Sequence, residues 1–244
     1  MKKSLLIALV VFSVTQLWAQ EKKEDMNFSI PLIGEKAPSF IAESTTGTLN
    51  FPSAYGRSWK ILFSHPQDFT PVCSSEILEL AHHQSEFDKL GVKLVVLSVD
   101  PVSTHKDWQK ALEQLNFKDR GQVKIKFPLV DDNSLAVSRL YGMIHEKTNS
   151  TKGVRGVFFI DPDNTIQAFY FYPMNVGRST EEIIRTVNAL QTVAKDNVKT
   201  PSDWKAGGDV LLPYAPTPGD TKTPAATKDT YSVSWFMTYK KLTN

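Results

Sequence analysis

The chain has a single cysteine, Cys73, and its flanking residues are suited to making a thiol reactive. Residues 59–64 have the composition of a buried strand, and apolar residues at helical spacing follow Pro71. Thr70 suits the N-cap of that helix and Pro71 its first position, so Cys73 is expected in the first helical turn. The positive end of the helix dipole and the unpaired backbone N–H groups there both favour the nucleophilic thiolate.

The helix dipole alone does not ionise such a thiol. It contributes about 0.3–1 kcal/mol, whereas a change of one pKa unit requires about 1.4 kcal/mol. A nearby cation is therefore needed, and the spacing of the sequence does not identify it. Thr70 lies one turn before Cys73, so its hydroxyl is expected to hydrogen-bond the sulfur, and Pro66 and Pro71 are expected to shield the loop from water.

The alternative is that Cys73 is an inert buried thiol, which is the usual state of a free cysteine. The residues Thr70 to Cys73 disfavour this alternative, because the start of a helix is a poor place to bury a thiol. A sulfur sealed inside the core and unreactive toward oxidants would refute the functional interpretation.

Strand and helix patterns alternate on both sides of this cysteine. A hairpin is expected within residues 40–51, and Gly91 is expected to end the helix that carries Cys73. Further strands are expected at 92–99, 126–130, 154–161 and 165–172, and further helices at 103–115, 134–140 and from Ser179 to about Ala194. This order predicts an α/β thioredoxin-like fold, with a mixed central sheet flanked by helices.

The chain is expected to have three parts. Residues 1–19 resemble a signal peptide, residues 28–195 form the thioredoxin-like domain, and residues 196–244 form a small carboxy-terminal extension. Within the extension, residues 213–230 form a proline-rich connector and 231–239 suit a terminal strand.

The first residues have the three-part layout of a secretory signal. Lys2 and Lys3 precede an apolar run at 5–14, which is too short to span a bilayer, and cleavage is expected at or near Ala19. The alternative is an uncleaved membrane anchor. The expected location is therefore the periplasm or the exterior of the cell, with no membrane attachment after cleavage.

Other functional classes have weaker support. Cleavage would reduce the net charge from +2 to zero and no other basic cluster dominates, so nucleic-acid binding is not expected. His82 and His83 are adjacent on a helix and point to different faces, so neither a metal nor another cofactor is expected. A hydrolase centred on Ser58 is disfavoured, because Lys60 replaces the last glycine of G-x-S-x-G and the strand follows the serine.

The segment DFTPVCSSE resembles the active-site signature of the peroxiredoxins, and FSHPQDFTPVC is closest to their one-cysteine subgroup. Trp108 fits the second helix of that subgroup. The segments VRGVFFIDPD, YPMNVGRSTEEIIR and TPSDWKAGGDVLLP extend the resemblance, which covers residues 28–215. The chain departs from the pattern in its export signal and in Ser74 and Ser75, which stand where a threonine pair is commoner.

The resemblance implies roles for seven residues. Cys73 is the peroxidatic nucleophile, Thr70 its hydrogen-bonding partner, and Arg155 the cation that favours the thiolate and orients the peroxide. Four supporting residues are Pro66 as a shield, His65 as a site-lining residue, Glu76 as the holder of an arginine, and Arg178 as a second arginine of the network. Glu76 could instead be an ordinary first-turn acid, and Arg178 a structural ion-pair residue.

The resemblance also implies a reaction and its partners. The protein would be an antioxidant oxidoreductase that reduces hydrogen peroxide and organic hydroperoxides through a Cys73 sulfenic acid, which an external thiol recycles. A homodimer is implied, formed through the strand at 168–172 and exchange of the carboxy-terminal segment. The alternative is a non-catalytic redox sensor or holdase that oxidises Cys73 once.

Overall fold

The computed structural model describes residues 30–214, 219 and 221–242. The predicted signal peptide, residues 1–19, lies outside the described residues. In the part of the chain that is described, no helix is long and apolar enough to cross a membrane.

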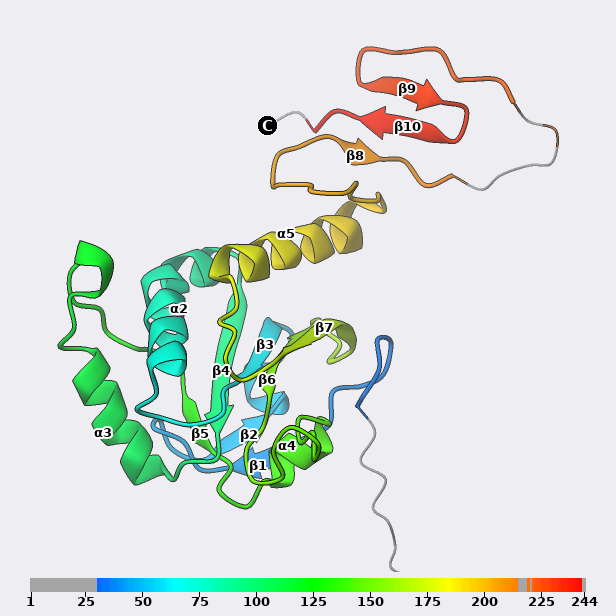
Figure 1. Cartoon of the computed structure of the whole chain (residues 1–244). Coiled ribbons are helices and arrows are strands. Elements are labelled where there is room, and N and C mark those ends of the chain that lie inside the picture. The colour runs from blue at the N-terminus through cyan, green and yellow to red at the C-terminus, as the bar shows by residue number, and fades with distance from the viewer. Residues whose placement is uncertain (1–29, 215–218, 220, 243–244) are drawn as a thin grey trace, which may run out of the picture.

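A five-stranded mixed sheet forms the centre of the protein, with the order β5-β4-β3-β6-β7 (Figure 1). The strands are β3 (Trp59–Ser64), β4 (Val92–Ser98), β5 (Leu129–Asp131), β6 (Arg155–Ile160) and β7 (Ile166–Tyr172). The pairs β3–β4 and β4–β5 are parallel, whereas β3–β6 and β6–β7 are antiparallel. The predicted mixed sheet is confirmed.

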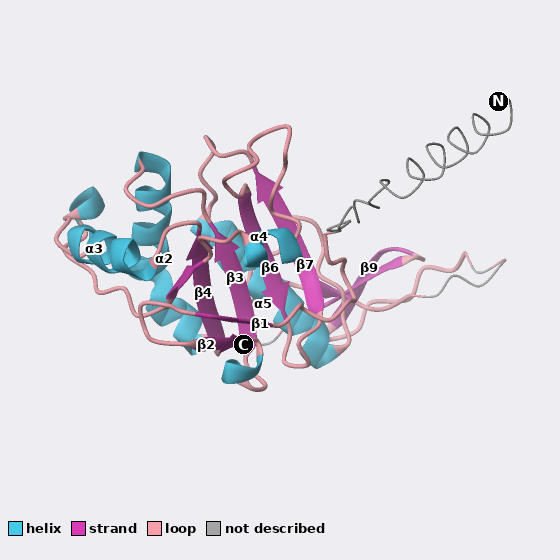
Figure 2. Ribbon diagram, turned by 90° about the horizontal axis from the view of Figure 1, so that it is seen from below, coloured by secondary structure: helices cyan, strands magenta, loops and turns pink. Residues whose placement is uncertain are grey.

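Helices and a hairpin cover the two faces of this sheet (Figure 2). The helices are α2 (Pro71–Lys89), α3 (Val102–Leu112), α4 (Ala136–Leu140) and α5 (Thr180–Asp196), with short 3₁₀ turns η1 (Ser53–Tyr55) and η2 (Phe117–Asp119). The hairpin consists of β1 (Phe40–Ala42) and β2 (Leu49–Phe51). Because side chains alternate along a strand, β3 contributes Ile61 and Phe63 to the core beneath α2 and α5 but Leu62 to the core beneath α4 and the hairpin.

Two elements differ from the sequence-based expectation. The strand expected at 126–130 is displaced to β5, because Pro128 has no N–H to donate to a sheet ladder. The single strand expected at 231–239 is a hairpin of β9 (Thr230–Ser234) and β10 (Met237–Lys240). Its aromatic alternation continues across the turn, and Tyr231 stacks on Tyr239 with ring centroids 5.1 Å apart.

The carboxy-terminal extension forms a second, smaller sheet beyond the end of α5 (Figure 1). Its strand order is β8-β10-β9, with β8 at Val210–Leu211. Val198, Trp204 and Val210 form a small apolar cluster between α5 and this sheet. At the start of α5, the Ser179 hydroxyl accepts a hydrogen bond from the backbone N–H of Glu182, which confirms the predicted cap.

Candidate active site

The strand β3 and the helix α2 place Cys73. A loop of six residues, 65–70, connects Ser64 to Pro71, and Cys73 is the third residue of α2. Thr70 is the N-cap residue, but its side chain caps no backbone N–H. Its hydroxyl donates instead to the carbonyl of Gln67 at 3.0 Å. The predicted hydrogen bond from Thr70 to the sulfur is therefore absent from the described contacts, because the hydroxyl closes its own loop.

The sulfur of Cys73 is covered rather than open at the end of the helix. Cys73 is only 1 % exposed, so the expectation of a thiol directly accessible to oxidants is wrong for this conformation. The neighbour of the sulfur is nevertheless a cation: Arg155 Nη1 lies 3.3 Å from Sγ and donates toward it. Cys73 also belongs to the apolar cluster beneath α2 and α5. An inert core cysteine would have hydrocarbon neighbours only, and its thiolate would have no compensating charge.

The strand order of the sheet explains why Arg155 lies beside the sulfur of Cys73. Arg155 is the first residue of β6, which pairs antiparallel with β3, so it lies near the end of β3 from which the loop to Cys73 departs. The carbonyl of Met174 accepts hydrogen bonds from Nε and Nη2 of the guanidinium, and this fixes the plane of the group. The approach of residues 82 positions apart is therefore a product of strand pairing.

Glu76, one turn after Cys73, joins two arginines. One carboxylate oxygen lies 2.6 Å from Arg155 Nη1 and 2.8 Å from Arg178 Nη2, and the other lies 2.8 Å from Arg178 Nε. Glu76 is 4 % exposed, so this is a buried ion cluster. One carboxylate between two guanidinium groups leaves a net charge of +1, which a Cys73 thiolate would neutralise. Both arginines and Glu76 thus lie together, as expected from the resemblance.

Arg178 has further partners that hold it in place. Its Nη1 donates to the carbonyl of Gly156 at 2.8 Å, and its guanidinium lies 3.4 Å from the centre of the Phe63 ring. Burial lowers the pKa of Arg178, and the bonds to Glu76 oppose that change. An arginine remains charged in proteins, so Arg178 adds a permanent positive charge beside Cys73.

His65 and Pro66 line the same region and are both buried. Burial lowers the pKa of His65 well below 6.5, and the neighbouring His105, Arg178 and Arg155 act in the same direction. His65 is therefore neutral at physiological pH. Neither of its ring nitrogens has a hydrogen-bond partner among the described residues, and its ring lies 5.1 Å from that of Trp108.

Sequence reasoning missed two side chains in this region, Asp68 and His105. Their side chains are fully buried, and Asp68 Oδ2 lies 2.7 Å from His105 Nδ1. Asp68 stands inside the segment DFTPVC, and His105 three residues before Trp108, so both lay within or beside quoted features. The sequence offered no signal that the two residues are in contact.

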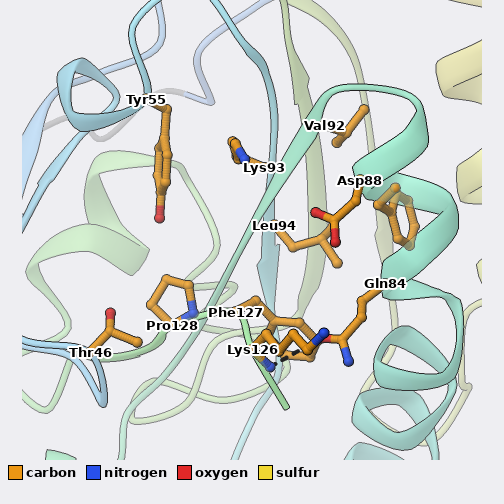
Figure 3. A pocket seen from close by; sticks show the side chains of 11 residues that line it. Thr46, Tyr55, Gln84, Asp88, Val92, Lys93, Leu94, Lys126, Phe127 and Pro128 are labelled. Carbon is orange, nitrogen blue, oxygen red and sulfur yellow. Dashed lines mark hydrogen bonds between the residues drawn. The ribbon is translucent and has the colours of Figure 1, made fainter. Parts of the chain in front are cut away.

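Figure 3 shows a separate cavity of about 440 Å³. It lies at the opposite end of the sheet from Cys73. Its lining includes Val92 at the start of β4, whereas Cys73 follows the end of the parallel strand β3. None of the seven predicted site residues lines it. Asp88, Lys93 and Lys126 are among its polar lining residues, but they form no constellation suited to nucleophilic chemistry.

The histidines 82 and 83 take part in no metal site among the described residues, where no group of three or more potential ligands occurs. His83 instead lies beside two acids of its own helix, with Nδ1 3.2 Å from Glu86 and Nε2 3.9 Å from Glu79.

The fold and site together define a thiol-dependent peroxidase of thioredoxin-like fold. Residues 33–169 match the AhpC/TSA family, and residues 189–225 match the C-terminal domain of 1-Cys peroxiredoxin. The chain belongs to the peroxiredoxin family, in its one-cysteine subgroup.

Proteins described as peroxiredoxins are similar to this chain over most of its length. A peroxiredoxin of Methanosarcina mazei is 41 % identical over 215 residues, which is 87 % of this chain and 98 % of that protein. A 1-Cys peroxiredoxin of Dictyostelium discoideum is 40 % identical over 74 % of this chain and 73 % of its own length. The solved structure of a yeast mitochondrial 1-Cys peroxiredoxin superimposes with a TM-score of 0.73 at 34 % identity, covering 86 % of this chain and 99 % of that one.

Replacing Arg155 by Met should slow the reaction of Cys73 with hydrogen peroxide. The loss of one preorganised donor at developing negative charge typically lowers a rate by roughly 10²–10³. Glu76 keeps its pair with Arg178, so the variant should remain folded. The measurement is the second-order rate constant for thiol oxidation in stopped flow.

The matched control is Arg57→Met, which removes an exposed ion pair with Asp163. It should react like the wild type. A rate for Arg155→Met equal to that of the control would remove Arg155 from the reaction.

Proposed function

We propose that Cys73 is the peroxidatic nucleophile of this peroxiredoxin and that Arg155 stabilises the charge of the reacting atoms. The observation that carries the proposal is the 3.3 Å approach of Arg155 Nη1 to the sulfur, with Glu76 and the Met174 carbonyl fixing the guanidinium. No described contact supports the assigned role of Thr70 as hydrogen-bond donor to the sulfur. Thr70 shapes the loop beside the sulfur instead.

The reaction proceeds in two halves. The thiolate of Cys73 attacks one oxygen of the hydroperoxide, the O–O bond breaks, and the departing hydroxide or alkoxide takes a proton from water. The sulfur is oxidised by two electrons to a sulfenic acid while the peroxide is reduced. An external thiol then attacks the sulfur and releases water, and a second thiol cleaves the resulting mixed disulfide to restore Cys73.

The reductant must be external, because the chain has one cysteine. The yeast structure concerns a resolving mechanism that uses glutathione/thioredoxin systems. We propose a thiol of that chemical class for this protein. Since Cys73 is 1 % exposed, a local movement of the loop 65–70 or of the first turn of α2 must open the sulfur to this thiol.

We further propose that the mature protein is exported and dimeric. The apolar run at 5–14 and the residues up to Ala19 support removal of a signal peptide. The strand β7 lies at the edge of the sheet, and six of its seven residues are partly exposed, which supports pairing with a second copy. Pairing would cover an edge that otherwise invites aggregation.

The hydrolase alternative gains nothing from the fold. Ser58 directly precedes β3, as the sequence indicated, so it occupies no strand-to-helix elbow. The buried ammonium group of Lys60 donates to the carbonyl of Gly56 at 2.8 Å and also bonds Asn164. Lys60 therefore ties this segment to the β6–β7 turn.

Turnover distinguishes the peroxidase from a sensor or holdase. Wild-type protein lacking residues 1–19 should consume many equivalents of hydrogen peroxide per subunit when supplied with glutathione, dithiothreitol or reduced thioredoxin. Cys73→Ser should consume none, because the nucleophile is lost, and Ser58→Ala should match the wild type. Consumption of one equivalent with every donor would favour the sensor.

Sedimentation of the mature protein at micromolar concentration should give twice the subunit mass. The expected contact is the main chain of β7 paired across a two-fold axis. A species of one subunit mass over the whole concentration range would contradict the dimer.

The full chain expressed in a Gram-negative host should be recovered from the periplasm with a new amino terminus near Gln20, as mass spectrometry would show. The variant Val10→Arg interrupts the apolar run and should stay in the cytoplasm uncleaved. Recovery of uncleaved wild-type protein in the membrane fraction would support the anchor instead.

A further inference from the structure

The loop that leads into Cys73 is anchored by a buried pair of titratable side chains that the reaction scheme leaves unused. Asp68 lies within this loop, and His105 lies on α3. Their side chains have no exposed surface, and they meet through a 2.7 Å contact between Asp68 Oδ2 and His105 Nδ1. Because the pair joins two separate elements, it fixes the loop relative to the body of the protein.

The other contacts determine where the protons lie. His105 Nε2 faces the carbonyl of Val130 at 3.0 Å, and a carbonyl only accepts, so Nε2 carries a hydrogen. A second proton must then lie between Nδ1 and the Asp68 carboxylate. Burial lowers the pKa of His105, but the bond to Asp68, the charge of Asp68, the Val130 carbonyl and the charge of Asp100 together raise that pKa above its ordinary value. Burial also raises the pKa of Asp68. Because both pKa values are raised, the proton between His105 Nδ1 and the Asp68 carboxylate is retained.

The anchor extends beyond the pair. The Asp68 backbone N–H donates to Asp100 at 2.8 Å, and the hydroxyl of Ser98 lies 3.2 Å from Asp68 Oδ1. The same Oδ1 lies 3.6 Å from Nε2 of His65, whose ring nitrogens have no hydrogen-bond partner among the described residues. Main chain and side chain of Asp68 are thus both held, at the centre of the loop.

The conformation next to Asp68 is one that needs such an anchor. Phe69 has φ of 54°, in the left-handed region that a bulky residue rarely adopts, and the residue is 58 % exposed. Its ring has one aromatic neighbour, Trp108, with ring centroids 6.4 Å apart, and a residue this exposed gains little packing energy to hold that backbone. Strained residues persist only where the surroundings determine them, and here Asp68 precedes Phe69 and the helix cap Thr70 follows it.

We propose that Asp68 and His105 are positioning residues for peroxide reduction at Cys73, because their buried bond holds the loop 65–70 in the conformation that orients a peroxide on the sulfur. The inference rests on the proposed function of Cys73. Without the bond, Phe69 relaxes and the loop that carries Pro66 and Thr70 shifts relative to the sulfur. The arginine cluster keeps its own contacts with Glu76, so the thiolate itself remains.

Two reactions of the Cys73 thiol distinguish the orientation of the peroxide from the nucleophilicity of the sulfur. Alkylation by iodoacetamide needs a reachable thiolate, whereas peroxide reduction also needs an oriented peroxide. Asp68→Ala should therefore lower the ratio of the hydrogen peroxide rate constant to the alkylation rate constant by roughly tenfold to a hundredfold, as for misplaced reacting groups generally. The hydrogen peroxide rate constant itself should fall, whereas a loop that only loosened around Cys73 would raise the alkylation rate constant and leave the hydrogen peroxide rate constant unchanged.

The conservative variant Asp68→Asn should restore most of the ratio, because its amide can donate to Nδ1 of a neutral His105. The matched control is Asp132→Ala. Asp132 is 2 % exposed and accepts hydrogen bonds from the backbone N–H groups of Val137 and Ser138. Both donors belong to α4, which covers the other face of the sheet. This control should lose thermal stability but keep the wild-type ratio. If Asp68 contributed only to overall stability, Asp68→Ala would give the same result as the control.

The variant His105→Gln tests the same bond from α3 and keeps the inference testable if Asp68→Ala does not fold. An unchanged ratio in either folded variant would overturn the inference, as would an Asp68→Asn ratio as low as that of Asp68→Ala. Wild-type protein that fails to react with hydrogen peroxide would instead remove the proposed function of Cys73, so the two failures are distinguishable.

Discussion

The buried ion cluster of Glu76, Arg155 and Arg178 is the interaction on which the site depends. Charges out of water are costly unless they are paired and hydrogen-bonded. Here the single carboxylate of Glu76 bonds both guanidinium groups, and the carbonyls of Met174 and Gly156 accept from the remaining donors. The cluster leaves one positive charge uncompensated, and the sulfur of Cys73 is the neighbour that can compensate it as an anion.

This arrangement explains how a cysteine can be both buried and reactive. A thiolate in a purely apolar core would be strongly disfavoured, because nothing replaces its hydration. Arg155 Nη1 at 3.3 Å replaces part of that hydration with a fixed donor. The same burial keeps bulk water and large oxidants away from the sulfur, so reduction by an external thiol has to be coupled to local opening. The loop 65–70 must therefore cover the sulfur of Cys73 in one state and expose it to the external thiol in another.

The loop 65–70 is held by polar contacts of Asp68 and Thr70 in addition to the ring contacts of His65 and Phe69 with Trp108. Asp68 is bonded to His105 and Asp100, and Thr70 closes a turn with Gln67, while Phe69 between them is exposed. Hydrogen bonds are directional and specify one geometry, but a few of them provide less stability than a packed core. A segment held in this way can keep a strained conformation and still open at modest cost in free energy.

The sequence by itself determined the strand–loop–helix around Cys73, the mixed sheet and the extension, because these follow from local periodicity, helix caps and the family motif. It also placed Glu76 one turn after Cys73, since that spacing is fixed by the helix. The family resemblance named Arg155 as the cation of the site, but only the tertiary structure placed its Nη1 3.3 Å from the sulfur. The tertiary structure alone decided that Thr70 bonds Gln67 instead of Cys73 and that Asp68 meets His105. The contacts of Arg155 and Asp68 join residues of different elements, and the contact of Thr70 is with one of two possible partners for its hydroxyl. Their geometry depends on strand pairing and packing, which the local pattern of residues does not encode.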